Sequence, residues 1–537
     1  MHLRELFRRK SLEQLSGDDT SAGPKLKKVL TARDVFNHGV AAIIGTGIFV
    51  LTGVAAHDHA GPGIILSFIL AGIACAFVSF AYAELASMIP VSGSAYTYAY
   101  ATLGEVVAWI IGWDLLLEYA VGASAVAVGW SAYLQNVLRS LGFHLPDYLA
   151  HAPAGLPWSA LLGTVALVVA GSVGLYRSYS GLKAAASNGP GHALTLVGSL
   201  ALLGFGLFKG WTVARQLTSI DLPAVLIILF LNYWLIKGVQ HTARMTAVFV
   251  VIKVAVIALF IALGIWHINS ANYRPFLPFG WHGVLSGAAI VFFAFIGFDA
   301  VTTLAEECKD PQKDMPRGVI GSLVFCTILY VVVAAIMTGA VSYLILGGSE
   351  AAAPMAKVMN ALGYFWASPL VSVGAIAGIT SVLIVLLFGQ SRIMMRMSRD
   401  GLMPSVFGKI HPRYQTPVWS IVIWGLVAAV TSGLLPIGEL AELTNIGTLA
   451  AFVLVCLGVI VLRKTEPDRP RKFRCPGSPW LPALGAIMSL ILMLSLPGLT
   501  WLRFVIWMAI GGVVYAFYGR KHSLMHQQQP EGKPDRK

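Results

Sequence analysis

Gly45 and Gly47 interrupt the stretch AAIIGTGIFVLTG, residues 41–53, which is otherwise apolar enough to cross a membrane as a helix. Glycine weakens a helix by about 1 kcal/mol relative to alanine, and glycines two residues apart do not share one helix face. We therefore expect the helix to unwind here, while close packing of small residues is the alternative. Unwinding frees amides that favour an anion and carbonyls that favour a cation, which together suit a zwitterion.

A second candidate break lies in FFAFIGFDA, residues 292–300, where Gly297 and Asp299 stand near mid-span. Unpaired backbone groups are costly in lipid, so an unwound stretch survives only against protein or a water-filled cavity. A single glycine is weaker evidence than a pair, and helix packing is an equal alternative here. If the helix unwinds, Asp299 is expected to cap the following half-helix or to order the site.

Lys253 stands in the apolar run FVVIKVAVIALF, about ten residues from the start of its span and so roughly 15 Å deep. An ionisable side chain near mid-bilayer is expensive, so we expect it to face the protein interior and to have a function. A buried amine can shed its charge by releasing a proton, which suits a proton carrier. The alternative is a structural lysine paired with a buried carboxylate.

Three carboxyl groups also stand in apolar segments. Asp114 and Glu118 of GWDLLLEYA are four residues apart and share one helix face. Two such groups can hold a proton between them, and the alternative is that one of them forms an ion pair at a helix end. Glu84 lies near the inner end of its span. It is either part of an inner gate or an ordinary carboxylate at the membrane interface.

The composition predicts that membrane-spanning helices position these residues. Of the 537 residues, 57% are hydrophobic and 12% are charged, whereas roughly 25% are charged in soluble proteins. The apolar runs are continuous rather than alternating, which predicts an all-α polytopic membrane protein and excludes a β-barrel. We expect about fourteen spans, at 35–57, 63–88, 97–136, 157–177, 191–210, 222–239, 243–267, 283–306, 317–343, 367–393, 417–434, 440–463, 479–496 and 500–518.

Basic residues predict the orientation of the spans. They concentrate in 392–413 and 463–474, which both lie inside if the N-terminus is cytoplasmic. An even number of spans places both termini on that side. We expect cytoplasmic tails at 1–32 and 519–537 around a transmembrane domain at 33–518. These loops account for the net charge of +13, so we expect the lipid bilayer rather than nucleic acid as the partner.

Enzyme and metal chemistry are not indicated by the sequence. The five cysteines form no CxxC pair, which argues against a metal site or a disulfide scaffold. No HExxH, GxSxG or Walker motif is present. We therefore expect no catalytic residues, no metal and no cofactor.

Five motifs occur in an order that resembles a known family: GVAAIIGTGIFVLTG, AYAELASMIPVSGSAYTYAYATLGE, FIGFDAVTTLAEE, DPQKDMPRG and MSRDGLMP. Over about 33–140 and 222–520 the chain resembles the amino acid–polyamine–organocation superfamily, and within it the bacterial cationic amino acid transporter-like family. The resemblance implies two five-helix inverted repeats and two trailing helices. Residues 141–221 depart from it by adding a helical hairpin at about 150–218. This hairpin is either peripheral, for oligomer or lipid contacts, or a tolerated insertion without function.

The resemblance also implies the substrate contacts. In the family's numbering of twelve helices, the break at Gly45 and Gly47 lies in helix 1 and the break at Gly297 lies in helix 6. Helix 1 is expected to bind the substrate carboxylate with its amides, and helix 6 is expected to bind the substrate ammonium with its carbonyls. A carboxylate of helix 3 faces the substrate, and an isoleucine of helix 8 forms an apolar wall that disfavours a large polar side chain. The implied contacts are Ile43, Gly45, Thr46, Gly47, Glu118, Phe293, Ala294, Ile296 and Ile379.

The coupling ion follows from the same resemblance. Lys253 matches a lysine of helix 5 that stands where sodium-coupled relatives hold a sodium ion. Thr380 and Ser381 of GITSVL resemble the helix 8 hydroxyls that bind this ion elsewhere. The implied mechanism is proton symport. Phe298, beside the second break, is a candidate for a gate that closes the site from outside, with plain aromatic packing as the alternative.

The sequence thus predicts a multi-pass carrier of the bacterial inner membrane that imports an amino acid together with a proton. An amino acid exchanger or a polyamine carrier is the alternative within transport, and a non-transporting amino acid sensor is the alternative from another class. The identity of the amino acid and the oligomeric state are left open by the sequence.

Overall fold

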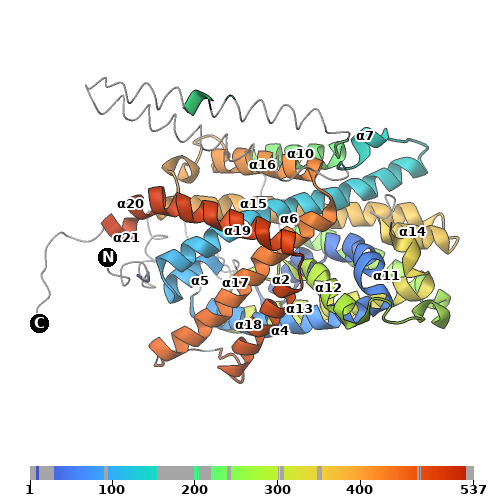
Figure 1. Cartoon of the computed structure of the whole chain (residues 1–537), viewed down its shortest axis with the longest axis horizontal. Coiled ribbons are helices and arrows are strands. Elements are labelled where there is room, and N and C mark those ends of the chain that lie inside the picture. Colours follow the sequence, from blue (N-terminus) through green and yellow to red (C-terminus); the bar gives the residue numbers. More distant parts are fainter. Residues whose placement is uncertain are drawn as a thin grey trace, which may run out of the picture. The chain divides into compact units, whose positions relative to one another are not determined.

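The structure of the protein is a computed structural model (Figure 1). It describes residues 8–10, 30–89, 95–153, 199–201, 204, 219–238, 243–299, 301–302, 308–347, 353–468, 471 and 473–527. Within these residues the regular secondary structure is helical, with one isolated bridge between Leu30 and Cys308. The predicted all-α class is therefore confirmed.

The helices of the first part of the chain are α2 (Ala32–Ile43), η2 (Gly47–Leu51), α3 (Thr52–Ala55), η3 (Ala56–Ala60), η4 (Gly61–Gly63), α4 (Ile64–Met88), α5 (Ala95–Thr102), α6 (Glu105–Ser140) and α7 (Asp147–Ala150). The middle part contains α10 (Leu222–Ile236), α11 (Ala243–Gly264), η5 (Ile265–His267), η6 (Ser270–Tyr273), α12 (Gly280–Val291), η7 (Phe292–Phe295), α13 (Pro311–Ala340), η9 (Tyr343–Leu346) and α14 (Pro354–Ala361). The last part contains α15 (Ala367–Arg399), η10 (Ser405–Gly408), α16 (Val418–Leu434), α17 (Ile437–Thr465), α18 (Trp480–Leu494), α19 (Gly498–Val514), η11 (Tyr515–Gly519), α20 (Arg520–His522) and α21 (Leu524–Gln527).

Many of these helices match the length and hydropathy of membrane spans. Among the described residues, seven helical stretches are long and apolar enough to cross a bilayer, and four more apolar helices are shorter. Two of the fourteen predicted spans, 157–177 and 191–210, fall largely outside the described residues. A polytopic helical membrane protein is therefore supported, while the count of fourteen and the inverted repeat stay predictions.

The chain divides into two compact units. The larger unit comprises 1–144, 223–432 and 437–537, and it contains every predicted site residue. The smaller unit comprises 145–222 and 433–436, and most of the predicted hairpin at 150–218 lies outside the described residues. The role of that hairpin stays a prediction.

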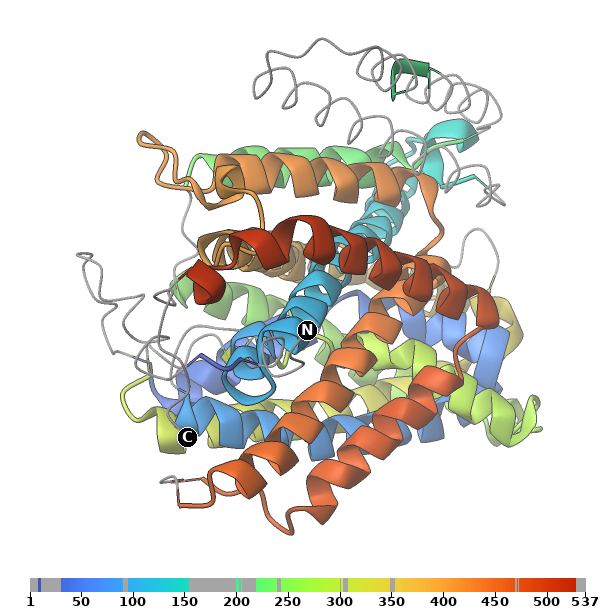
Figure 2. The ribbon, with the colours of Figure 1, turned by 60° about the vertical axis from the view of Figure 1, so that its left-hand side comes forward.

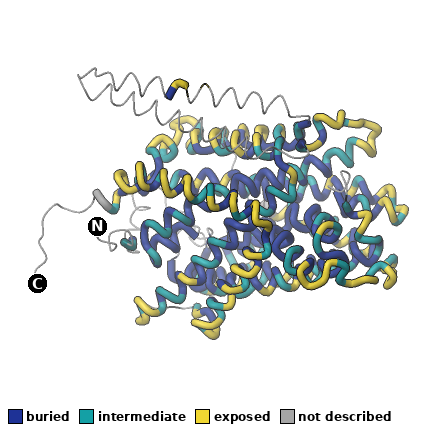
Figure 3. The backbone as a smooth tube through the Cα atoms, in the orientation of Figure 1, coloured by how far each residue is buried: buried dark blue, intermediate teal, exposed yellow. Residues whose placement is uncertain are grey.

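The longest helices of the larger unit pack against one another in pairs. Helix α6 packs on both α15 and α17, and α13 packs on both α2 and α4 (Figures 1 and 2). Helices α16 and α19 expose large apolar side chains, for example Leu426 and Val430 in α16 and Leu502 and Val505 in α19. Figure 3 colours the chain by how far each residue is buried. Exposed apolar side chains of this kind suit contact with lipid chains, so they fit a membrane setting.

The first predicted break is confirmed. Helix α2 begins with a capping box between Thr31 and Asp34. It ends at Ile43, and Ile44 adopts an extended backbone with ψ of 100°. The helical ladder stops at the bond from the Ile44 amide to the Val40 carbonyl (3.1 Å) and resumes with the Phe49 amide and the Gly45 carbonyl (3.4 Å). The amides of residues 45–48 lie between these two bonds.

The second predicted break is confirmed as well. Helix α12 tightens into the 3₁₀ turn η7, and Ile296 then turns the chain out of the helix with ψ of 136°. Gly297 has φ of +111°, a conformation that only glycine adopts easily. The Gly297 amide donates to the Asp299 carboxylate at 3.3 Å. This bond connects Asp299 to the unwound stretch, and its expected role, as a cap of the half-helix or in ordering the site, stays a prediction.

Candidate functional site

The two unwound stretches touch each other at their glycines. A Cβ atom built on Gly47 would lie 2.2 Å from the Ala294 Cα, and one built on Gly297 would lie 2.9 Å from the Ala42 carbonyl oxygen. Neither distance leaves room for a side chain. Each break thus needs a glycine so that its backbone can approach the backbone of the other break.

Tyr330 of α13 links the same two stretches. Its buried hydroxyl lies 2.8 Å from the Ile43 carbonyl oxygen and 2.9 Å from the Ala294 carbonyl oxygen. Its ring packs against Phe295, with 5.4 Å between the ring centroids. Because both carbonyls belong to broken helices, one hydroxyl on α13 supplies a donor that the helical ladders no longer provide.

Lys253 of α11 satisfies two further carbonyls of the first break. Its ammonium donates to the carbonyl oxygens of Ala41 and Ile44, both at 2.8 Å, and to the Ser381 hydroxyl of α15 at 3.0 Å. The side chain is fully buried. All three N–H groups of the ammonium therefore have acceptors, and the lysine joins α11, the break after α2, and α15.

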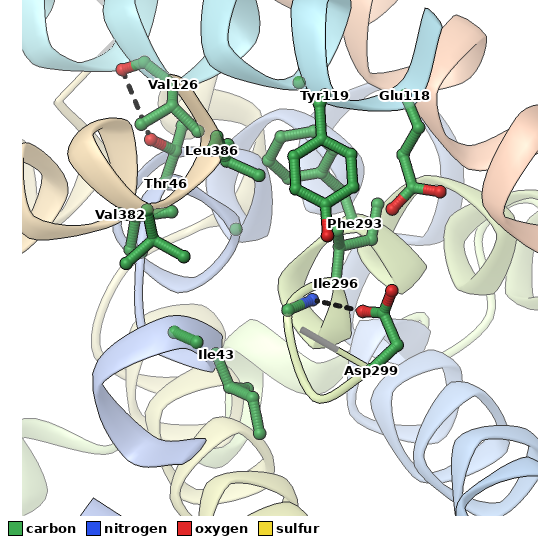
Figure 4. Close-up of a pocket in the computed structure, with 16 residues that line it drawn as sticks. Ile43, Thr46, Glu118, Tyr119, Val126, Phe293, Ile296, Asp299, Val382 and Leu386 are labelled. Atoms are coloured by element: carbon green, nitrogen blue, oxygen red, sulfur yellow. Dashed lines mark hydrogen bonds between the residues drawn. The ribbon is translucent and has the colours of Figure 1, made fainter. Parts of the chain in front are cut away.

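A narrow cavity opens between the two breaks and the helices α6 and α15 (Figure 4). Its free space is about 20 Å³, room for about one water molecule, so a larger ligand requires the cavity to widen. Eight residues predicted for the site line it: Ile43, Gly45, Thr46, Gly47, Glu118, Phe293, Ile296 and Asp299.

Ala294 and Ile379 of the predicted set are not among the lining residues. The Ala294 carbonyl is hydrogen-bonded to Tyr330 on the far side of the break, and the Phe293 carbonyl accepts from the Ile296 amide at 3.3 Å. Ile379 is fully buried in α15. Two of the three helix 6 carbonyls named by the resemblance, those of Phe293 and Ala294, thus have a donor within the protein, although a carbonyl oxygen can accept two hydrogen bonds.

Sequence reasoning expected an apolar wall at Ile379 but missed the apolar residues that line the cavity. Gly122 and Val126 of α6 continue the stripe that begins at Glu118, because the three residues are four apart. Val382 and Leu386 form a matching i, i+4 pair on α15. This spacing is visible in the sequence once Glu118 is placed at the site. Tyr119 lines the cavity beside Glu118, and Figure 4 shows its ring reaching in from α6.

The structure separates the two predicted hydroxyls of α15. Ser381 contacts Lys253, whereas Thr380 accepts from the indole N–H of Trp130 at 3.0 Å. Thr380 also donates to the Ile376 carbonyl at 2.7 Å within its own helix. In this structure the two hydroxyls therefore have different partners. Ser381 thus contacts Lys253 directly and Thr380 does not, and the coupling role of both residues stays a prediction.

Phe298, the candidate for an outer gate, is fully buried in an aromatic cluster. Its ring packs on Tyr82 and Phe452, with centroids 5.7 Å and 5.1 Å apart. Tyr82 lies in the last two turns of α4, which ends at Met88. The other end of α4 follows the turn at Gly61–Gly63, where the chain reverses direction after the first span. Phe298 therefore lies toward the Met88 end of α4. That end is cytoplasmic under the predicted orientation, which favours plain aromatic packing over an outer gate, and the gate stays a prediction.

Glu84 of α4 is fully buried in an ion pair. Arg463 of α17 donates to it from two nitrogens, at 2.9 Å and 2.5 Å, and the Cys475 amide donates at 2.7 Å. A bidentate pair of this kind fixes the geometry of both side chains. Glu84 therefore ties the end of α4 to the end of α17 and the segment that follows it, and a role in an inner gate stays a prediction.

Similarity to known proteins agrees with this architecture. The amino acid permease family matches the chain over residues 31–515. The chain belongs to the amino acid permease family. This family membership confirms the resemblance predicted from the motifs, and it makes the protein a transporter rather than an enzyme.

Three relatives cover nearly the whole permease. The branched-chain amino acid permease BcaP of Bacillus subtilis (strain 168) is 44% identical over 97% of this chain and 99% of that protein. The methylthioribose transporter of the same strain is 42% identical over 98% of this chain and 100% of that protein. The branched-chain amino acid permease BcaP of Lactococcus lactis subsp. cremoris (strain MG1363) is 34% identical over 96% of this chain and 99% of that protein.

Proposed function

We propose that this permease imports an amino acid with an apolar, branched side chain across the bacterial inner membrane by proton symport, with both termini in the cytoplasm. The observation that carries the proposal is the cavity between two broken helices, since it offers main-chain groups beside an apolar wall. Alternating access around this cavity is the mechanism we infer, built on the predicted inverted repeats. A site at broken helices near mid-membrane is typical of secondary transporters.

The break after α2 supplies the anion site. The amides of residues 45–48 lie in a gap of the helical ladder and at the start of a half-helix, where the positive end of the helix dipole favours a carboxylate. The substrate ammonium then lies toward the helix 6 break, near the Ile296 backbone and the Asp299 carboxylate. These two ends are common to all amino acids, so they bind the class without selecting a member.

Selection is supported by the apolar wall of Val126, Val382, Val385 and Leu386. A wall of branched aliphatic side chains favours a substrate side chain of the same kind and disfavours a charged one. The names of the two BcaP relatives agree with this substrate class. They support the proposal more than the "cationic" in the name of the wider family does.

Lys253 supports proton coupling through its three contacts. The ammonium has a donor for each of the Ala41 carbonyl, the Ile44 carbonyl and the Ser381 hydroxyl. A neutral amine has one donor fewer, so deprotonation breaks at least one link between the first break and its neighbours. Protonation and release at Lys253 would thereby change how firmly the first break is held.

A methylthioribose carrier is a second candidate, because a relative of 42% identity carries that name. The carboxyl groups of Glu118 and Asp299 border the cavity and could accept hydrogen bonds from sugar hydroxyls. Such a substrate has no carboxylate for the amides of the first break. An amino acid exchanger, a polyamine carrier and a non-transporting amino acid sensor would use the same cavity, and transport measurements distinguish them.

Uptake into proteoliposomes separates these functions. We expect labelled leucine or isoleucine to accumulate when the outside is acidic, to accumulate without a sodium gradient, and to resist competition by methylthioribose and by polyamines. Accumulation that requires only preloaded amino acid would establish an exchanger. Tight binding of the amino acid without any uptake would establish a sensor. Inhibition of leucine uptake by methylthioribose, and not by other amino acids, would indicate a methylthioribose carrier.

Gly122 offers a test of the side-chain pocket. A Cβ atom built on Gly122 would lie 3.3 Å from Thr444 Cγ2 and 3.7 Å from Leu386 Cδ1, so alanine fits with little adjustment while it narrows the cavity. One methyl group in an apolar pocket changes selectivity by about tenfold or more. We expect Gly122→Ala to lose leucine uptake relative to alanine uptake by about that factor.

The matched control for this test is Gly438→Ala, where an added Cβ meets no atom within 4 Å. It should leave the ratio of leucine to alanine uptake unchanged. An unchanged ratio in Gly122→Ala, in a protein that still transports, would show that α6 does not border the bound side chain.

A further inference from the structure

Asp114 and Glu118 lie one turn apart on α6, where this helix packs on α17. Their exposed fractions are 2% and 1%. Within the part of the chain that the structure describes, the Asp114 Oδ1 and the Glu118 Oε2 have no hydrogen-bond partner. Buried polar atoms normally have one, so the two side chains form an unusual pair.

Helix α17 contacts both members of the pair. A Cβ atom built on Gly447 would lie 2.6 Å from the Asp114 Oδ1, so the carboxyl group rests against the helix at a residue without a side chain. Thr448, the next residue, is hydrogen-bonded to Glu118. Space for Asp114 is thus built into α17, while Glu118 reaches the cavity (Figure 4).

Each described lysine or arginine that is buried has another partner. Lys10 pairs with Asp400 at 2.8 Å, and Arg503 pairs with Glu439 at 2.9 Å. Lys253 donates to two carbonyls and a hydroxyl in the coupling site described above. The acid pair on α6 therefore has no counter-ion among these cations.

The groups that face the pair from other elements are neutral or acidic. Asp299 of the second break adds a negative field at Glu118, as Asp114 does. Tyr82 of α4 and Tyr119 lie within the field of Glu118. From α15, the side-chain amide of Gln390 donates to the Leu116 carbonyl of α6 at 3.2 Å. From α19, the indole N–H of Trp507 donates to the Trp113 carbonyl at 3.2 Å.

We propose that Asp114 and Glu118 form a proton-binding site separate from Lys253, and that the pair holds at least one proton in this conformation. Two adjacent carboxylates in a membrane interior without a cation are far more costly than a neutral acid. Glu118 borders the cavity, so the proton passes from its carboxyl group to water there when the cavity opens. Asp114 takes no part in substrate contact and acts as the buried partner that keeps the proton on the pair.

Infrared spectroscopy of the purified permease in lipid tests the bound proton directly, without reference to transport. We expect a carbonyl band of a protonated carboxylic acid at neutral pH, with a shift in D₂O. The band should disappear in the double variant Asp114→Asn with Glu118→Gln and remain in Asp147→Asn, which changes an exposed carboxylate. Identical spectra of the double variant and the unchanged protein would overturn the proposal. This readout stands even if the proposed amino acid uptake is wrong.

A second measurement, which rests on the proposed function, uses Asp114→Asn alone. The amide copies the shape of the acid but cannot release a proton, so we expect leucine to bind as before while the pH dependence of its uptake flattens. The ratio of uptake at low and high external pH should fall below that of the unchanged protein and stay above unity, because Lys253 and Glu118 are still present. A pH profile identical to that of the unchanged protein would show that Asp114 takes no part in the proton site.

Discussion

Uptake by Gly47→Ala is expected to fall by about tenfold or more, since the added methyl group has no room. Forced overpacking costs about 1–3 kcal/mol, which corresponds to a factor of roughly 5 to 150. The Cβ would lie 2.2 Å from the Ala294 Cα and 2.8 Å from its amide nitrogen. Both atoms belong to backbone, so a rotamer change cannot relieve the contact. The two broken helices would have to move apart, which separates the anion site from the apolar wall.

The effect should appear first in substrate binding. We expect leucine to lose its stabilisation of Gly47→Ala in thermal unfolding, while the fold itself remains detectable by size-exclusion chromatography. Gly438→Ala serves as the control, because an added Cβ there meets nothing within 4 Å. Normal binding and uptake by Gly47→Ala would mean that the two breaks do not need to touch.

The breaks themselves were predictable because their signals are local. Gly45 and Gly47 weaken one turn of a helix wherever it is packed, and the structure ends α2 at Ile43. Gly297 was a weaker signal, yet its φ of +111° shows why a glycine is required at that position. Local chemistry of the backbone can be read from one sequence without knowledge of the neighbours.

The partners of the freed carbonyls were not predictable in the same way. Tyr330 stands nearly three hundred residues after Ile43, and nothing near it in sequence indicates that its hydroxyl meets both breaks. The difference between Thr380 and Ser381 depends on the rotation of α15 about its own axis. Rotation of a helix and distant pairing are set by packing, which a single sequence does not state.

The role of Phe298 shows the same limit from another side. Its position beside the second break was correct, but whether it lies on the inner or outer side depends on which helices surround it. The contacts with Tyr82 and Phe452 place it toward the end of α4 at Met88. An aromatic residue next to a site is thus not enough to predict the direction in which it closes the site.

Lys253→Met is expected to lower proton-driven uptake by about tenfold or more, because the buried carbonyls of Ala41 and Ile44 lose their donor and each unsatisfied group costs about 1–3 kcal/mol. Methionine keeps most of the length of the side chain without the charge. Uptake by this variant should no longer respond to an imposed pH gradient. Ser381→Ala removes one acceptor of the three, so its loss should be smaller and its response to the gradient should persist.

A matched control distinguishes this role from a general need for lysine. Lys357 of α14 also donates to a backbone carbonyl, that of Gly347, at 3.2 Å, but it lies outside the coupling site. Lys357→Met should therefore retain gradient-driven uptake. If Lys253→Met still accumulates leucine in response to a pH gradient, or if the unchanged protein requires sodium, the proton is not carried at Lys253. The contacts of this lysine with the first break and α15 would then serve only to hold the broken helix in place.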